Sequence, residues 1–140
     1  MSPMACFEDL AIGQTASLGK TITEADILLY AAVSTDSNPL HINAEAAKAS
    51  MFGERIAHGM LSAGLISAVL GTRLPGPGSI YMGQTLRFRA PVKIGATVVA
   101  TVEITALNAE KHRATLKTTC TVGAEVVIEG EALVQVPVRG

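Results

Sequence analysis

The chain is poor in aromatic side chains and in charge. Tryptophan is absent, aromatic residues make up 4% of the 140 residues, and charged residues make up 16% with a formal net charge of −1. No block of lysine and arginine could neutralise the phosphates of a nucleic acid, so we predict no nucleic-acid partner. Hydrophobic residues still make up 49% of the chain, which predicts a core of alanine, valine, leucine and isoleucine.

Cysteines and membrane-length apolar runs are also scarce. Cys6 and Cys120 lie far apart and in no metal-like spacing, which predicts reduced thiols in a cytoplasmic protein. The first ten residues carry no lysine or arginine, unlike a signal peptide. The uncharged segment between Arg55 and Arg73 contains three glycines and falls short of the roughly 20 apolar residues of a membrane span. We expect a buried helix there and no membrane partner.

Length and hydropathy together predict one domain that forms an oligomer. A chain of 140 residues has the usual size of a domain, so residues 1–140 are expected to share one core. The mean hydropathy of +0.38 is high for a domain that remains alone in water. We therefore expect part of the apolar surface to close against another subunit, in a homodimer or a larger homo-oligomer.

Two helices are signalled in the first half of the chain. Thr23 and Asp26 have the spacing of a capping box, which predicts a helix over residues 24–34. This helix should stop at the Asp-Ser-Asn-Pro stretch, because the residue before Pro39 is pushed away from helical geometry. Asn43 is suited to cap a short second helix with the sequence AEAAKASMF.

The segment IAHGMLSAGLISAVLGTRL predicts a long central helix. Small residues recur at every fourth position, namely Gly59, Ala63, Ser67 and Gly71. Leucine, isoleucine and valine fill most of the remainder. Because the helix is apolar nearly all round, we expect other elements to wrap it. The stretch LPGPGS should end it.

The remaining segments alternate with the period of strands. Residues 14–22 alternate loosely, and from Ile80 onward the period becomes two. The residues predicted to face inward are Leu86, Phe88, Ala90, Val98, Ala100, Val102, Ile104, Ala114, Leu116, Thr118, Cys120, Val122, Val126, Ile128, Ala132, Val134 and Val136. Short polar turns separate these runs, which is typical of an antiparallel meander. The sequence therefore predicts an α+β fold in which the sheet curls around the apolar helix.

The stretch STDSNPLHIN admits two interpretations. In one, Asp36 bonds its own backbone in an Asx-turn and His41 is a half-buried structural residue. In the other, Pro39 stiffens the loop so that Asp36 and His41 polarise one water between them. The N–H of Gly59 opens the central helix, where unpaired amides and the helix dipole favour negative charge. A carbonyl oxygen bound there would gain stabilisation, typically a few kcal/mol, as its charge develops.

The motifs STDSNPLHIN, ERIAHGML and LPGPGSIYMGQTLRFRAPVKIGATV occur in this order. With them the chain resembles the MaoC-like dehydratase family, in particular its (R)-specific enoyl-CoA hydratases, over nearly its whole length. The resemblance implies a hot-dog fold, in which an antiparallel sheet wraps a long central helix and the sheets of two subunits join. It also implies syn addition of water to a trans-2-enoyl thioester, giving the (R)-3-hydroxyacyl thioester.

The same resemblance implies roles for the motif residues. Asp36 would be the base that activates water, and His41 would hold that water and handle the proton delivered to the α-carbon. Asn38 would orient the loop, and the Gly59 amide would receive the thioester oxygen. His58, the histidine before that glycine, is expected to make a structural hydrogen bond.

Further residues are assigned to the substrate. Ser67 lies eight residues beyond the glycine that opens the central helix, or about 12 Å at 1.5 Å per residue. It therefore cannot bind the same oxygen and is given a supporting pocket role. Leu65 and Leu70 are candidates for limiting acyl-chain length. Arg87 and Lys93 could meet phosphates of coenzyme A or of an acyl-carrier prosthetic group, although an ordinary solvated strand face is the alternative.

Other functions remain open at this point. A (3R)-hydroxyacyl-acyl-carrier-protein dehydratase would carry the same residues and differ in the carrier that it binds. A non-catalytic acyl-thioester-binding module is the alternative from a different class, although it would not need both Asp36 and His41. The three histidines have no metal-ligand spacing, so we predict neither a metal nor a cofactor.

Overall fold

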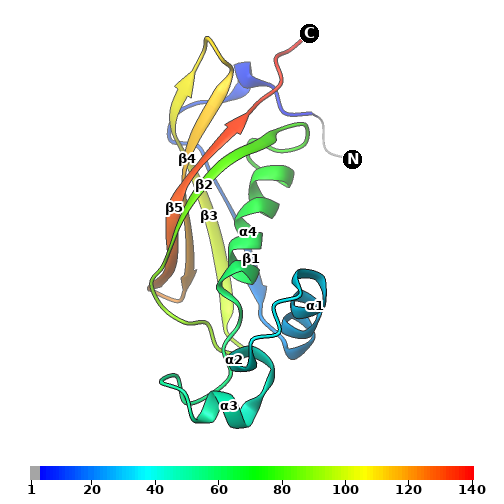
Figure 1. Cartoon of the computed structure of the whole chain (residues 1–140). Coiled ribbons are helices and arrows are strands. Elements are labelled where there is room, and N and C mark those ends of the chain that lie inside the picture. The colour runs from blue at the N-terminus through cyan, green and yellow to red at the C-terminus, as the bar shows by residue number, and fades with distance from the viewer. Residues whose placement is uncertain (1–3) are drawn as a thin grey trace.

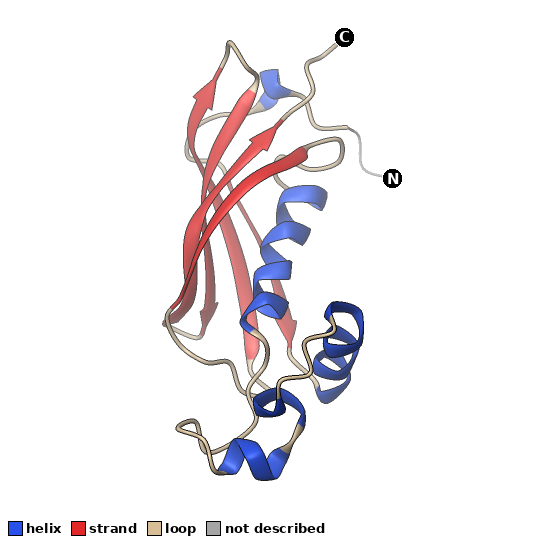
Figure 2. Cartoon of the chain, viewed as in Figure 1, coloured by secondary structure: helices blue, strands red, loops and turns tan. Residues whose placement is uncertain are grey.

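The computed structural model describes residues 4–140 and consists of one antiparallel sheet with helices on one side (Figures 1 and 2). The five strands have the order β1-β3-β4-β5-β2, so β1 and β2 are the two edges. Their bounds are Thr15–Thr21 (β1), Ile80–Phe88 (β2), Thr97–Asn108 (β3), Arg113–Val122 (β4) and Glu125–Gln135 (β5). The predicted α+β class with an antiparallel sheet is thus confirmed.

Helix α4 (Gly59–Thr72) lies along the concave side of the sheet (Figure 1). Its buried residues are Ser62, Ala63, Ile66, Val69 and Leu70. They pack against the inward residues of β3 and β4, such as Val102 and Leu116, which are fully buried. This is the apolar core that the sequence predicts, and its apolar burial is the main stabilising term of the fold.

In the single chain the sheet curls around one side of α4 and leaves its opposite side open. Met60, Gly64, Ser67 and Gly71 are exposed on the side of α4 that faces away from the sheet. The sheet covers only one side of the helix, because β2 ends the sheet there. Of the predicted small-residue face, only Ala63 is buried.

Two strand residues also differ from the predicted alternation. Val126 is exposed and Val127 is buried, because the pairing of β4 with β5 shifts register between Cys120 and Thr121. Such a bulge reverses the alternation on one side of it, so Val126 is out of phase while the later residues Ile128, Ala132 and Val134 face inward as predicted. Phe88, predicted to face the core, is 54% exposed at the end of the edge strand β2.

The helices before α4 gather at the end of the sheet where α4 begins (Figure 1). Helix α1 (Glu24–Ser34) has the predicted capping box, with Thr23 and Asp26 each bonding the other's backbone N–H. It ends before the Asp-Ser-Asn-Pro stretch, at Thr35, whose φ is 65°. The predicted cause of the helix end is therefore wrong, since the left-handed residue lies four positions before the proline.

Pro39 begins a helix instead of only ending one. Helix α2 (Pro39–Ile42) was not predicted; Asn38 caps it and proline occupies its first turn, where the missing N–H costs nothing. Helix α3 (Ala44–Lys48) follows and is capped by Asn43 as predicted, although it is shorter than expected. A short 3-10 helix, η1 (Phe7–Asp9), lies near the N-terminus.

The predictions on membrane spans and on cysteines can be compared with the structure. Within residues 4–140, no helix has the length and apolar character needed to cross a membrane. Cys6 and Cys120 are free thiols, as predicted. Burial raises the pKa of the Cys120 thiol to about 11, so this thiol stays protonated and packs as an apolar side chain.

Candidate active site

Asp36 lies in the turn between α1 and α2, and the turn is built from its own hydrogen bonds. The Oδ1 atom of Asp36 accepts the N–H of Asn38 at 3.2 Å, and Oδ1 of Asn38 accepts the N–H of Leu40 at 3.1 Å. The Asx-turn of the first interpretation is therefore present. It does not use the whole carboxylate, and the Asp36 side chain remains exposed and able to bind a ligand.

His41 is held in one tautomer by the main chain. Its ring is 8% exposed, and Nδ1 lies 2.7 Å from the carbonyl oxygen of Ile56. A carbonyl oxygen only accepts, so Nδ1 must carry the hydrogen. In the neutral ring, Nε2 then presents a lone pair. His41 is thus prepared to accept a hydrogen bond or a proton at Nε2.

His58 connects the turn to the start of α4. Its Nε2–H donates to the main-chain oxygen of Asp36 at 2.8 Å, which is the structural hydrogen bond predicted for this residue. Its ring stacks on that of His41 with centroids 3.9 Å apart, and Tyr30 lies on it at 4.7 Å. These contacts fix the two catalytic candidates, Asp36 and His41, relative to α4.

The cluster has the composition of a metal site but not the geometry. One side-chain ligand atom from each of Asp36, His41 and His58 lies within 4.8 Å of the others. The two imidazole planes, however, are stacked at only 27° to each other. Imidazole lone pairs lie in the ring plane, so two stacked rings cannot both direct a nitrogen at one ion at about 2.0 Å.

Gly59 is the first residue of α4, where its N–H has no intrahelical acceptor. An ideal Cβ on Gly59 would lie 2.6 Å from two ring carbons of Phe88. The phenyl ring therefore occupies the space that a side chain would need. The open backbone of this glycine is what allows Phe88, and a ligand beside it, to approach the start of the helix.

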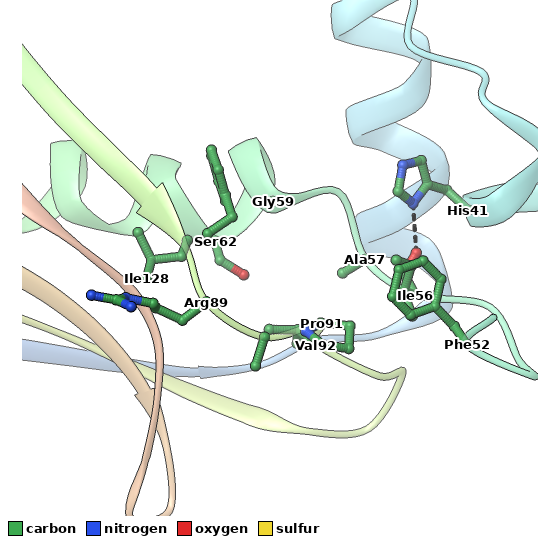
Figure 3. Close-up of a pocket in the computed structure, with 12 residues that line it drawn as sticks. His41, Phe52, Ile56, Ala57, Gly59, Ser62, Arg89, Pro91, Val92 and Ile128 are labelled. Atoms are coloured by element: carbon green, nitrogen blue, oxygen red, sulfur yellow. Dashed lines mark hydrogen bonds between the residues drawn. The ribbon is translucent and has the colours of Figure 1, made fainter.

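Two cavities meet at this point. The larger, of about 310 Å³, includes His41, Gly59, Ser62 and Phe88 among its lining residues and is otherwise mostly apolar (Figure 3). The smaller, of about 190 Å³, is open and is lined by Asp36, His41, His58, Gly59, Met60 and Phe88. Both cavities are lined in part by His41, Gly59 and Phe88. The structure thus brings together the carboxylate, the imidazole and the helix-start amide that the sequence analysis singles out.

The residues predicted to contact the substrate lie elsewhere in the single chain. Ser67 lines a separate cavity between α4 and β2, and Leu65 borders an apolar groove beside α1. Leu70 is part of the core. Arg87 lies on the outer face of the sheet, and Lys93 forms an exposed ion pair with Glu54 at 3.6 Å. Their proposed contacts with acyl chain or phosphates stay predictions.

Sequence reasoning missed Phe88 and Ser62 as lining residues, and it missed Arg55. The Nε–H of Arg55 donates to the carbonyl oxygen of His41 at 2.7 Å, and Nη1 binds the carboxylate of Glu24 at 2.8 Å. Arg55 therefore joins the start of α1 to α2. Its position just before the AHGM motif could have indicated in the sequence that Arg55 lies near the site.

Comparison with known proteins agrees with this geometry. The family described as MaoC like domain matches residues 10–128. An (R)-specific enoyl-CoA hydratase of Rhodospirillum rubrum is 63% identical over 96% of this chain and 93% of its own length. A 3-hydroxybutyryl-CoA dehydratase of Methylorubrum extorquens is 55% identical over 94% of this chain and 83% of its own. The solved (R)-hydratase of Aeromonas caviae has a TM-score of 0.90 and 45% identity, covering 93% of this chain and 99% of that one. This similarity confirms the predicted hot-dog arrangement.

Proposed function

The chain belongs to the MaoC-like dehydratase family, and on this basis we propose that it is an (R)-specific enoyl-CoA hydratase. It adds water reversibly to trans-2-enoyl-CoA and gives (R)-3-hydroxyacyl-CoA. One observation carries the proposal: the smaller cavity is lined by Asp36, His41 and Gly59, the first residue of α4. It shares His41 and Gly59 with the larger, mostly apolar cavity. We also propose that residues 1–140 form one catalytic domain.

The proposed reaction uses one water between two acceptors. The carboxylate of Asp36 and Nε2 of His41 each accept a hydrogen of that water, which leaves an oxygen lone pair free to attack the β-carbon. Asp36 acts as the base. The proton taken by the Asp36 carboxylate passes to Nε2 of His41 and from there to the α-carbon, which restores the carboxylate and the neutral imidazole, so atoms and charge balance. Since both groups lie on one side of the substrate, the addition is syn.

The thioester oxygen is proposed to bind at the N–H of Gly59. As the water oxygen attacks, negative charge moves onto the thioester oxygen in an enolate-like transition state. A helix-start N–H and the helix dipole stabilise that charge. Removal of one such donor in other enzymes costs roughly 10²–10³ in kcat, so this contact would account for a substantial part of the rate.

We propose that the protein acts as a homodimer that pairs through β2. Among the residues that the structure describes, this edge strand pairs with β5 alone. It leaves Ile80, Tyr81, Met82 and Phe88 exposed. A long apolar edge with free N–H and C=O groups is a template for another strand. A second copy on this edge would also cover the exposed side of α4. The mass in solution, measured by light scattering, should be twice the 14.5 kDa of one chain.

A substrate panel tests the proposed activity. Purified protein is given trans-2-enoyl-CoA thioesters from four to twelve carbons, and the same acyl groups on an acyl-carrier protein. We expect fast hydration of at least the short CoA thioesters and slower reaction of the carrier-bound ones. Preference for the carrier would assign an acyl-carrier-protein dehydratase, and tight binding without turnover would assign a non-catalytic module. The cytoplasmic location stays a prediction from the sequence.

A further inference from the structure

Ser62 has a hydroxyl group that the protein itself does not use. Its side chain is 0% exposed, and within residues 4–140 its Oγ has no hydrogen-bond partner. The same residue lines the larger cavity together with His41 and Gly59. Figure 3 shows its hydroxyl oxygen directed toward that cavity from near the start of α4.

A buried hydroxyl without a partner calls for an explanation, because most buried polar side-chain atoms are hydrogen-bonded. A serine inside a helix commonly bonds the carbonyl four residues earlier. In α4 that carbonyl, of His58, accepts the N–H of Leu61, and within the described residues the Ser62 hydroxyl bonds neither it nor another group. The neighbouring lining residues Ala57, Val92 and Ile128 offer no polar side-chain atom. The missing partner is therefore expected to come from a bound ligand.

The position of Ser62 on α4 identifies the atom that it can reach. Ser62 is three residues after Gly59, which places the two on the same side of the helix and about 4.5 Å apart along its axis. Helical side chains lean toward the N-terminus, so the Ser62 hydroxyl lies over the turn that Gly59 opens. The spacing of about 12 Å that excludes Ser67 from this role does not exclude Ser62. One ligand oxygen can accept from both the Gly59 N–H and the Ser62 hydroxyl.

We propose that Ser62 is a catalytic residue that donates its hydroxyl hydrogen to the thioester oxygen of the substrate, as a second donor beside the Gly59 amide. This inference rests on the proposed hydratase function. The hydrogen bond strengthens as the thioester oxygen becomes enolate-like, so it lowers the barrier more than it tightens substrate binding.

Three variants test the role of Ser62 in crotonyl-CoA hydration. Ser62→Ala should lower kcat by roughly 10²-fold with KM changed less than about threefold. Its thermal midpoint should stay equal to or above that of the wild type, because the lost hydroxyl bonds nothing in the free protein. Ser62→Thr keeps the hydroxyl and should recover most of kcat. Thr72→Ala removes a hydroxyl at the far end of α4, where it bonds Ala68, and should leave kcat unchanged.

A spectroscopic readout separates contact from structure. Butyryl-CoA, which lacks the double bond and does not react, is bound with an isotope-labelled thioester carbonyl. Its infrared stretch should move to lower frequency in the wild type and move part of the way back in Ser62→Ala. An unchanged stretch and unchanged kcat in Ser62→Ala would overturn the inference while the hydratase function stands. A raised KM with unchanged kcat would overturn it too. A wild type that hydrates no enoyl thioester would overturn both proposals.

Discussion

The Nε2–H of His58 donates to the main-chain oxygen of Asp36 at 2.8 Å, between residues that lie 22 positions apart in the chain. His58 directly precedes Gly59, so this contact joins the turn that carries the carboxylate to the start of the helix that carries the amide. His58 is therefore one of the contacts that hold the turn with the proposed base close to the proposed oxyanion donor.

Removal of the His58 side chain should loosen this connection. His58→Ala leaves a main-chain oxygen without its donor and removes the ring stacked on His41, which should cost about 1–3 kcal/mol of unfolding free energy. We expect kcat to fall by at least tenfold, because the reacting groups are no longer held in place. His58→Gln retains a side-chain donor and should recover part of both losses. Wild-type kcat in a folded His58→Ala protein would contradict the positioning role.

Asp36→Asn tests the base. The amide oxygen of asparagine can still accept the N–H of Asn38, so the turn should keep its shape. The proton acceptor is lost, however, and general-base contributions amount to roughly 10²–10⁴-fold. Crotonyl-CoA hydration should fall by that range while the circular dichroism spectrum and thermal midpoint remain. Glu45→Gln removes an exposed carboxylate on α3 and serves as the control, with unchanged turnover expected. Equal turnover in both variants would exclude Asp36 as the base.

Gly59→Ala tests the space at the start of α4. The added methyl group would lie 2.6 Å from the Phe88 ring, so this ring, which lines both cavities, must move. We expect kcat/KM to fall at least tenfold with the fold retained, because the helical backbone at this position accepts alanine. Gly19→Ala adds a methyl group on the other edge strand, β1, where the nearest side-chain atom, Cγ2 of Val99, lies at an ordinary contact distance of 3.7 Å. It serves as the control and should leave activity unchanged. Full activity of Gly59→Ala would show that no ligand approaches there.

The capping box of α1 should be visible in acid unfolding. The hydrogen bond from the Thr23 backbone N–H, with a further contribution from Lys20, lowers the pKa of Asp26 below its ordinary value. A lowered folded-state pKa contributes stability above the ordinary aspartate pKa of about 3.9, and this contribution is lost as the pH falls through the folded-state value. Asp26→Asn keeps an acceptor but cannot titrate. The stability difference between wild type and variant should be constant above about pH 5 and shrink below about pH 4. A difference that stays constant into acid would contradict this assignment.

The sequence predicted best what depends on near neighbours in the chain. The capping box at Thr23 and the cap at Asn43 each need only residues within three positions, and both are present. The alternation along β3 depends on one strand and one buried face, and it too is confirmed. The role of Pro39 was ambiguous in the sequence, because a proline can end one helix or begin the next. In the structure α1 ends at the left-handed Thr35, and Pro39 begins α2.

What the sequence could not predict depends on how distant elements pack. The bulge opposite Cys120 changes the facing of Val126, and no pattern in one strand reveals the register of its neighbour. In the site, the motif residues Asp36, His41 and Gly59 do come together. Ser62 could not be assigned from sequence, because a serine on an apolar helix does not indicate whether its hydroxyl faces a carbonyl or a cavity.

The most direct test of the account is the stereochemical course of hydration in heavy water. Crotonyl-CoA is hydrated in D₂O, and the 3-hydroxybutyryl product is analysed for its configuration at C3 and for the position of deuterium at C2. The proposed (R)-hydratase function predicts the (R) alcohol, and a single water held between Asp36 and His41 predicts that the deuterium and the hydroxyl group are added to the same face. An (S) alcohol, or deuterium on the opposite face, would contradict it.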